Sequence, residues 1–505
     1  MPEDCDAENR PERRLRAYAR LLREDSPCGR AVRQTERAAR LSVDTRLYLY
    51  GFVPAIMEFA GWVLEEAVRS GRKRLYFLSR DGYQIYLAAC KLVELRKLPV
   101  ECRYLYVSRY AMRVPAYHLD MDGCLDRICS GGLEVTLERI LRRAALTEEE
   151  ACEVARRIGR RETYREVLNR SQTAELKEIL GREPQFLQRV KEHSMEAYEN
   201  AMGYLQQEGL LSAVPYAIVD SGWVGTCQQT LQRLLQSRMP DIRVEGYYFG
   251  LYEIPVRADA QDYHGWYFSP RTGLNRKVHF SNSLFEAVCS AEQGMTVGYG
   301  RENGVCSAEQ GIVVGYDREN GRYLPQLDPA GNPNGAFLRR SLEALQSFLE
   351  IYGGSGEVCG KTAGTCGVKH RFSIRRHFEL FGARNLVKKR FTLLMARPSL
   401  VETESYGGLF FSEDVLTGND REVAAPLRQE EIRDLYILRR LAILNGWKKG
   451  NIHESAWAEG SIVRCGSNIR KNLRHTRWYK YLVYGRKQCK AWLRTIIIRW
   501  ERSDH

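Results

Sequence analysis

The pattern of apolar and polar positions changes sharply after residue 72. A short apolar run ends at Leu78, the polar loop Ser79-Arg80-Asp81-Gly82 follows, and apolar positions at helical spacing continue over 83–95. A short apolar run bounded by turn residues is typical of a buried strand, whereas apolar residues three or four positions apart indicate a helix. The segment therefore predicts a strand, a loop and a helix in succession.

The same succession recurs along the chain. Further strands are predicted at 103–107, 216–219 and 244–251, and a helix is predicted at 227–235. Strands that alternate with helices of about ten residues or more favour a parallel sheet with helices on both faces. We expect an α/β fold with a doubly wound, mostly parallel, Rossmann-like sheet.

Longer segments surround this sheet, and the length of 505 residues exceeds what one hydrophobic core usually organises. We expect a charged, solvated helical lead-in at 1–45, an α/β domain at 46–330 with a helical insertion at about 125–211, a Gly-rich connection at 331–370, a mainly helical domain at 371–465 and a basic aromatic tail at 466–505.

Net charge and cysteine content limit the classes of partner and the cellular compartment that we expect. The formal charge is +14, which favours anionic partners such as phosphorylated metabolites, nucleic acid or an acidic lipid surface. Fourteen cysteines without a regular framework, and no apolar signal peptide after Met1, favour reduced thiols in the cytoplasm. The apolar segment 47–68 contains Pro54 and glutamates, so it predicts a buried helix and not a membrane span.

Two loops carry the main candidate site. Ligands of open parallel sheets bind beyond the carboxyl ends of the strands, where a helix start favours an anion. The predicted anion-binding residues of the first loop are Ser79, Arg80 and Gly82, where glycine allows close backbone approach. Those of the later loop are Ser221, Gly222, Gly225 and Thr226, and Trp223 in the same loop is a candidate substrate-binding residue that stacks on a sugar or base. Arg109, after the second strand, is predicted to complete a basic rim with Arg113.

Two acids lie in the same loops. Asp81 and Asp220 are the candidate catalytic residues for proton transfer, and Asp220 is the candidate ligand of a Mg²⁺ ion. A purely structural alternative stays open, because Asp and Ser at strand ends often cap the next helix and Arg80 has the charge to pair with Asp81.

Other segments predict less. Asp120-Met121-Asp122-Gly123 has the form of an aspartyl phosphatase nucleophile motif but follows a poor buried strand, and Gly360-Lys361-Thr362 lacks the first glycine of a P-loop. Cys289-Ser290-Ala291-Glu292-Gln293-Gly294 returns 17 residues later, which predicts a local duplication in a hairpin or loop.

The motifs Tyr76-Phe77-Leu78-Ser79-Arg80-Asp81-Gly82-Tyr83, Ile218-Val219-Asp220-Ser221-Gly222-Trp223-Val224-Gly225-Thr226 and Leu284-Phe285-Glu286-Ala287 resemble a set of bacterial proteins. These are hydrolases of the haloacid dehalogenase (HAD) superfamily associated with surface-polysaccharide biosynthesis. Their phosphatase module precedes the part matched here, at roughly 46–465, and is absent from this chain, so phosphatase activity is not carried over. The resemblance implies bacterial cytoplasm and envelope-glycan assembly.

Three functions follow as hypotheses. The first is an enzyme, a hydrolase or transferase, that handles a phosphorylated sugar or nucleotide. The second is a non-catalytic scaffold of a glycan-assembly complex, held at an acidic membrane surface by the tail at 468–505. The third is a phosphoribosyltransferase-like enzyme, by analogy with the order of a Gly-containing loop, an Arg-bearing strand and an acidic Thr-containing loop. Nucleic-acid binding through the tail is a weaker alternative.

Overall fold

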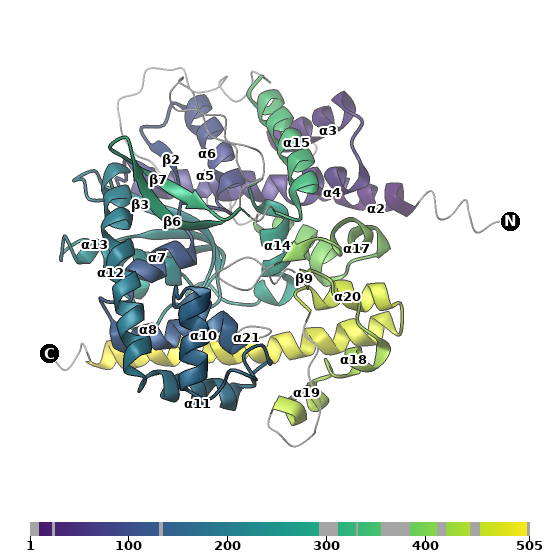
Figure 1. Cartoon of the computed structure of the whole chain (residues 1–505). Helices are drawn as coiled ribbons and strands as arrows, with labels where there is room; N and C mark the ends of the chain where they lie inside the picture. The colour runs from purple at the N-terminus through teal and green to yellow at the C-terminus, as the bar shows by residue number, and fades with distance from the viewer. Residues whose placement is uncertain are drawn as a thin grey trace.

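A computed structural model describes residues 10–22, 26–130, 135–291, 312–329, 332–354, 384–411, 421–444 and 455–501. A five-stranded sheet with the order β2-β1-β3-β4-β5 lies at its centre (Figure 1). The strands are β1 (Arg74–Leu78), β2 (Glu101–Leu105), β3 (Tyr216–Trp223), β4 (Gly246–Leu251) and β5 (Tyr263–Phe268). Every neighbouring pair is parallel. The predicted α/β fold is confirmed, and β5 is a strand that the sequence pattern had not indicated.

Alternate residues of β1 belong to two different cores. Leu75 and Phe77 pack into one buried cluster, whereas Tyr76 and Leu78 pack into the other, because successive side chains of a strand point to opposite faces. The first face is covered by α5 (Val53–Arg69), α6 (Tyr83–Arg96) and α14 (Asn282–Cys289). The second is covered by α7 (Arg109–Ala116), α12 (Pro184–Gln207) and α13 (Thr226–Gln236). The sheet therefore lies between two helical layers.

The most apolar helices belong to the core. The helices α4 (Val43–Gly51) and α5 join at Phe52. Within the described residues, Val43–Arg69 is the one stretch long and apolar enough to cross a membrane, and 89% of its most apolar window is buried inside the protein. The predicted buried helix at 47–68 is confirmed as this pair.

The lead-in is helical, as α2 (Arg10–Ala19) and α3 (Pro27–Ala38). Leu15, Tyr18 and Leu22 are nevertheless buried, and the Tyr18 hydroxyl donates a 2.6 Å hydrogen bond to Glu402. The prediction that this segment is solvated is wrong, because its few large apolar residues are spaced three and four apart and share one helix face.

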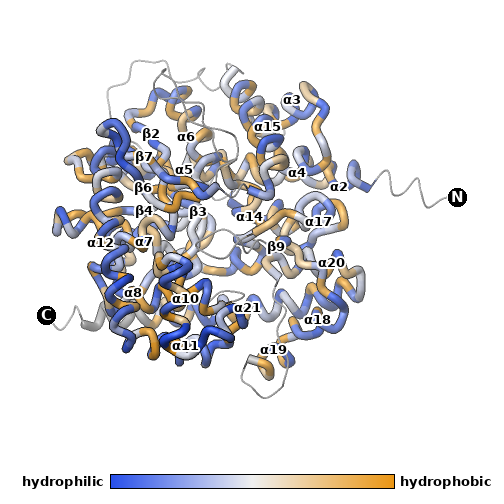
Figure 2. Tube along the Cα trace, viewed as in Figure 1, coloured by the Kyte–Doolittle hydropathy of each residue, from blue (hydrophilic) through white to orange (hydrophobic). Residues whose placement is uncertain are grey.

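The insertion is helical as predicted, and its helices have a core of their own. They are α8 (Met121–Ile128), α9 (Leu137–Arg143), α10 (Glu148–Arg157), α11 (Arg170–Leu180) and α12. Ile128, Leu141, Val154 and Phe186 meet in a buried cluster separate from the sheet, while Leu205 near the end of α12 packs on the sheet. Hydrophilic residues dominate α10 and α11 in Figure 2, which fits their outer position.

The predicted Gly-rich connection at 331–370 is in part a helix. α15 (Gly335–Gly354) buries Phe337, Leu345 and Phe348 against α3, α4 and α6. The apolar residues of this helix lie three or four positions apart and share its buried face. Residues 355–383, which include Gly360-Lys361-Thr362, lie outside the described residues.

The duplicated segment is described only in part. Residues 292–311 lie outside the described residues. The chain resumes in an antiparallel hairpin of β6 (Val313–Glu319) and β7 (Arg322–Leu327). This hairpin packs on α12 and α7.

The C-terminal part is mainly helical, as expected, and shares the central core. Its elements are the π-helical turn η3 (Thr392–Ala396), α17 (Leu400–Tyr406), β8 (Phe410–Phe411), β9 (Arg421–Glu422), α18 (Gln429–Arg433), α19 (Ile437–Leu444), α20 (Ala458–Cys465) and α21 (Ile469–Glu501). Val401, Tyr406 and Trp457 lie in the same buried cluster as the α5 face of the sheet.

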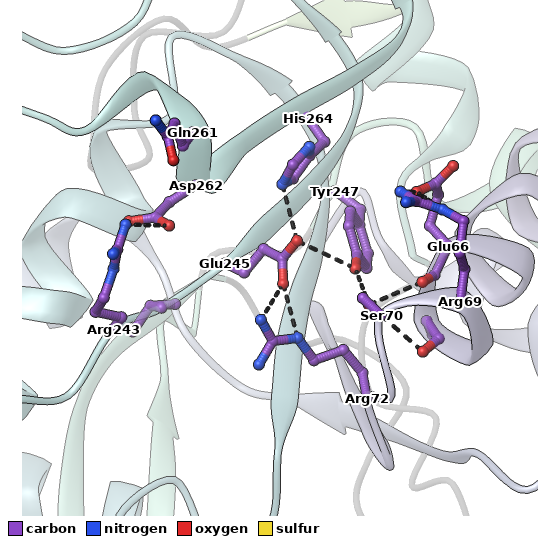
Figure 3. Close-up of polar contacts among 12 residues, drawn as sticks. Glu66, Arg69, Ser70, Arg72, Arg243, Glu245, Tyr247, Gln261, Asp262 and His264 are labelled. Atoms are coloured by element: carbon purple, nitrogen blue, oxygen red, sulfur yellow. Dashed lines mark hydrogen bonds and ion pairs between the residues drawn. The ribbon is translucent and has the colours of Figure 1, made fainter.

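An ion network ties the strand starts together at the amino-terminal end of the sheet (Figure 3). Glu245 lies 2.8 Å from Nε2 of His264 and accepts a 2.7 Å hydrogen bond from Nε of Arg72. Tyr247 donates to the same carboxylate over 3.3 Å and meets Ser70 at 3.0 Å. Burial raises the pKa of Glu245, but His264 and Arg72 outweigh burial and lower it overall. This end of the sheet is therefore closed by paired charges.

Candidate functional site

The opposite, carboxyl end of the sheet has a topological switch point between β1 and β3. The two strands are neighbours in register, with Phe77 beside Val219. The helix after β1, α6, covers one face, whereas the helix after β3, α13, covers the other. Open α/β sheets bind ligands beyond the carboxyl ends of the strands at such a switch point, and the region beyond the ends of β1 and β3 is called the crevice below. The two loops identified from sequence both end in it.

The first loop is in direct contact with the end of β3, which extends through Trp223 and so includes residues 220–223 that the sequence had placed in the second loop. The hydroxyl of Ser221, which is buried, donates a 3.2 Å hydrogen bond to Oδ2 of Asp81. Asp220, the preceding residue, accepts a 2.8 Å hydrogen bond from the backbone N–H of Ser221. Asp81 and Asp220 are 139 positions apart in the sequence, and the parallel pairing of β1 with β3 brings them together.

A third carboxyl group joins them from α14. Oε1 of Glu286 accepts a 2.6 Å hydrogen bond from Nε1 of Trp223, at the end of β3. The indole ring of Trp223 packs against Phe268, Phe280 and Phe285. Sequence reasoning missed Glu286 as a site residue, although Leu284-Phe285-Glu286-Ala287 was among the motifs of the resemblance and was the available signal.

The pKa values of the three carboxyl groups are all raised above their usual range. Burial, and then the charge of Asp81, raise the pKa of Asp220 to about 8. The same two causes raise the pKa of Glu286 to about 7. Burial also raises the pKa of Asp81, against the opposing charges of Arg80 and Arg109. Like charges held together out of water favour the protonated form, so protons remain in the site near neutral pH.

Two arginines lie among these carboxyl groups. Arg109, at the first turn of α7, lowers the pKa of all three, and Arg80 lowers that of Asp81 and Glu286. With the residues that the structure describes, neither side chain makes a hydrogen bond or an ion pair. Arg80 and Asp81 therefore do not form the ion pair that the purely structural alternative predicted. An arginine at a crevice without a carboxylate partner is suited to an anionic ligand.

Arg113 extends this basic side by one turn of α7. Burial, and then the like charge of Arg109, lower the pKa of Arg113 to about 10. A guanidinium with a lowered pKa gains from an anion that replaces its lost hydration. Sequence reasoning had considered Arg113 only as part of a basic rim.

Ser79 and Gly82 serve the backbone of the first loop. The Ser79 hydroxyl donates to the carbonyl of Val107 over 2.6 Å and accepts from the N–H of Val107 over 2.9 Å, so its proton is engaged within the protein. A Cβ on Gly82 would lie 2.4 Å from the carbonyl oxygen of Leu78. The close approach expected at Gly82 is thus an approach to its own strand.

The second loop exposes a helix start. Gly225 has a φ of +79° and precedes Thr226, the first residue of α13. Gly222 has a φ of +132°, and a Cβ there would lie 2.0 Å from the carbonyl oxygen of Gly250. The first N–H groups of a helix have no intrahelical partner and carry a partial positive charge. This loop can therefore offer backbone donors to an anion.

Asp120 is a structural residue here. Its side chain accepts a 3.0 Å hydrogen bond from the N–H of Gly123 and caps α8. It also pairs with Arg127 and Arg233. The phosphatase-like motif thus forms a helix cap with two ion pairs.

Oxygen ligands suited to Mg²⁺ are present, in a limited set. Asp81, Asp220 and Glu286 supply carboxylates, which Mg²⁺ prefers, and Mg²⁺ is commonly held by one or two carboxylates together with substrate phosphates. Among the described residues, no three His, Cys, Asp or Glu side chains are arranged to hold a metal ion by themselves. A Mg²⁺ ion at Asp220 stays a prediction.

Two surface hollows lie away from this crevice. One, of about 430 Å³, is lined by Gly203, Arg238 and Tyr323. The other, of about 640 Å³, is lined by Lys388, Lys389 and other residues near α2. Neither hollow contains a cluster of carboxyl groups with raised pKa values. Because groups with shifted pKa values gather at functional sites, the crevice is the better candidate site, although these hollows have measurable volume.

No model of a known protein family matches the sequence, and no curated protein matches it. The resemblance to HAD-associated proteins therefore stays a prediction.

Proposed function

We propose that the crevice between β1 and β3 binds a phosphorylated small molecule, a sugar phosphate or a nucleotide, and transfers a proton to or from it. The observation that carries this proposal is the meeting of three carboxyl groups with Arg80 and Arg109, whose guanidinium groups have no hydrogen-bonding partner among the described residues. Arginine pairs with phosphate through two parallel hydrogen bonds, which supports a phosphate group as the ligand's anchor.

The carboxyl groups have the chemistry of general acids and bases. A pKa near the working pH lets one group both hold and release a proton, and Glu286 at about 7 and Asp220 at about 8 meet that condition. Asp220 accepts a hydrogen bond from the backbone N–H of Ser221, and Glu286 accepts one from the indole N–H of Trp223. These hydrogen bonds orient both carboxyl groups. If Mg²⁺ enters with the substrate phosphates, Asp220 and Asp81 are its ligands and it supplies charge neutralisation.

The order of the three segments also supports the phosphoribosyltransferase-like alternative, because the charge of Arg109, after β2, lowers the pKa of both Asp81 and Asp220. The ligands tested below therefore include candidate substrates of both hydrolysis and group transfer. The setting in bacterial glycan assembly rests on the resemblance alone.

Thermal unfolding tests the proposal. The full chain is measured with sugar phosphates, nucleotide sugars, nucleotides and phosphoribosyl pyrophosphate, each with and without Mg²⁺, because a ligand of the native state raises the midpoint by mass action. The variants are Arg109→Ala and Asp220→Asn. Arg182→Ala is the matched control, since the side chain of Arg182 is 82% exposed on the insertion, away from the crevice.

A midpoint rise with one ligand class, lost in Arg109→Ala and kept in Arg182→Ala, supports the proposal. A turnover assay with that ligand then separates binding from catalysis, and we expect Asp220→Asn to abolish turnover. A rise of equal size in all variants locates binding elsewhere and overturns the proposal. No rise with any ligand favours the non-catalytic scaffold.

A further inference from the structure

The long helix α21 is fastened to the protein along one side. It runs across the lower part of the molecule in Figure 1 as the long yellow helix. Two of its own polar residues, Asn472 and Thr476, are buried on the side that faces the protein. Lys480 pairs with Glu459 and Lys487 pairs with Glu253, each over 2.6 Å. These contacts fix which side of the helix faces outward.

The outward side carries large apolar side chains. Trp478 is 63% exposed and Trp492 is 64% exposed. Leu482 and Leu493 are also exposed, and so is Tyr481, at the edge of this side, where its hydroxyl lies 3.4 Å from Nε2 of His279. Spacings of three, four and about eleven residues between exposed positions match a helical stripe, continued through exposed Gly485 and Cys489. Contiguous exposed apolar surface usually marks an interaction site.

The same side is basic without a balancing acid. Residues 468–493 contain eight Lys or Arg and no Asp or Glu. Two of the eight, Lys480 and Lys487, form the ion pairs that fasten the helix. Other basic residues are exposed beside the apolar stripe: Arg470, Lys471, Arg474, Arg486 and Lys490. The surface is therefore complementary to an anionic partner that also accepts apolar groups.

We propose that this outer face of α21 binds the surface of an anionic lipid bilayer, with the helix lying in the plane of the interface. Tryptophan and tyrosine rings settle at the headgroup level, and leucine side chains enter the acyl boundary. Lysine and arginine reach the anionic headgroups with their charged ends while their stems cover apolar surface. Leu482 and Leu493 favour lipid over nucleic acid, because aliphatic side chains offer no stacking platform to a base.

Vesicle co-sedimentation of the full chain tests this surface. The vesicles contain phosphatidylcholine alone or phosphatidylcholine with phosphatidylserine. One variant removes apolar groups, Trp478→Ser with Trp492→Ser, and another reverses charge, Arg474→Glu with Lys490→Glu. The control is Met195→Ser, because Met195 is a similarly exposed apolar residue on α12, away from α21. Each protein is first shown to unfold at the wild-type midpoint.

We expect binding to the phosphatidylserine vesicles that weakens sharply as salt rises. Both double variants should lose at least about tenfold in affinity, and Met195→Ser should bind like wild type. Equal binding of wild type and both double variants overturns the proposal. The proposal is also overturned if the protein does not bind the vesicles but is retained on single-stranded RNA. It is overturned as well if the protein self-associates and the same variants abolish that self-association.

Discussion

Nε1 of Trp223 donates a 2.6 Å hydrogen bond to Oε1 of Glu286, and this bond joins the end of β3 to the helix α14. The indole thus serves as a support for a carboxyl group, with its ring packed among Phe268, Phe280 and Phe285. Trp223 had been considered from sequence as a platform for a sugar or base. Its ring is buried, so the structure favours the supporting role.

Trp223→Phe should destabilise the protein by about 1–3 kcal/mol through the lost hydrogen bond, in addition to the loss of packing. It should also raise the pKa of Glu286 above its value of about 7, because a donor to the charged form is removed. Trp266→Phe is the matched control, since Trp266 is equally buried and its Nε1 has no hydrogen-bond partner in the described structure. Denaturant unfolding compares the two, and equal losses would contradict a role for this bond.

Asp220→Asn should stabilise the ligand-free protein at alkaline pH. The pKa of Asp220 is raised to about 8 in the folded state, so the folded state loses stability as pH rises from the unfolded value near 4 to about 8. The amide has no charge to bury, and its advantage should be on the order of a few kcal/mol at pH 9 and vanish by about pH 4. Denaturant unfolding across this range measures it. An Asn variant that is less stable than wild type at pH 9 would refute the raised pKa.

Gly222→Ala should cost several kcal/mol and impair folding. A Cβ at this position would lie 2.0 Å from the carbonyl oxygen of Gly250, and the φ of +132° is unfavourable for alanine. Gly71→Ala isolates the conformational part, because Gly71 has a φ of +71° and nothing within 4 Å of an added Cβ. We expect a loss of about 1–2 kcal/mol at Gly71 and a clearly larger one at Gly222, measured by thermal unfolding.

Glu245→Gln should weaken the amino-terminal end of the sheet by about 3 kcal/mol, since it leaves Arg72 and His264 without their shared carboxylate. The folded pKa of Glu245 is lowered, so its contribution is present above the unfolded pKa of about 4.3 and is lost as pH falls through the folded value. The difference from wild type should therefore shrink below about pH 4. Glu178→Gln, in an exposed pair with Arg182, should change stability by less than about 1 kcal/mol.

The local pattern of apolar and polar residues predicted much of the fold and the two acidic segments of the site, but not Glu286. The apolar run before Ser79 and the one before Asp220 each predicted a strand with a polar loop at its end, because period and turn chemistry are properties of neighbouring residues. The parallel, doubly wound sheet followed from the alternation of strands and helices. The strand β5 was missed, since an aromatic run such as Tyr263–Phe268 fits strand or helix on local grounds.

Only the tertiary structure decided how the site is assembled. Asp81, Asp220 and Glu286 span 205 positions, and strand order and helix packing bring them together. Burial and mutual repulsion then raise their pKa values, which no residue type carries alone. The sequence by itself determined which acids and arginines the chain possesses and where its strands end. Their proximity depends on long-range packing, because interactions between residues so far apart leave no periodic signal in the chain.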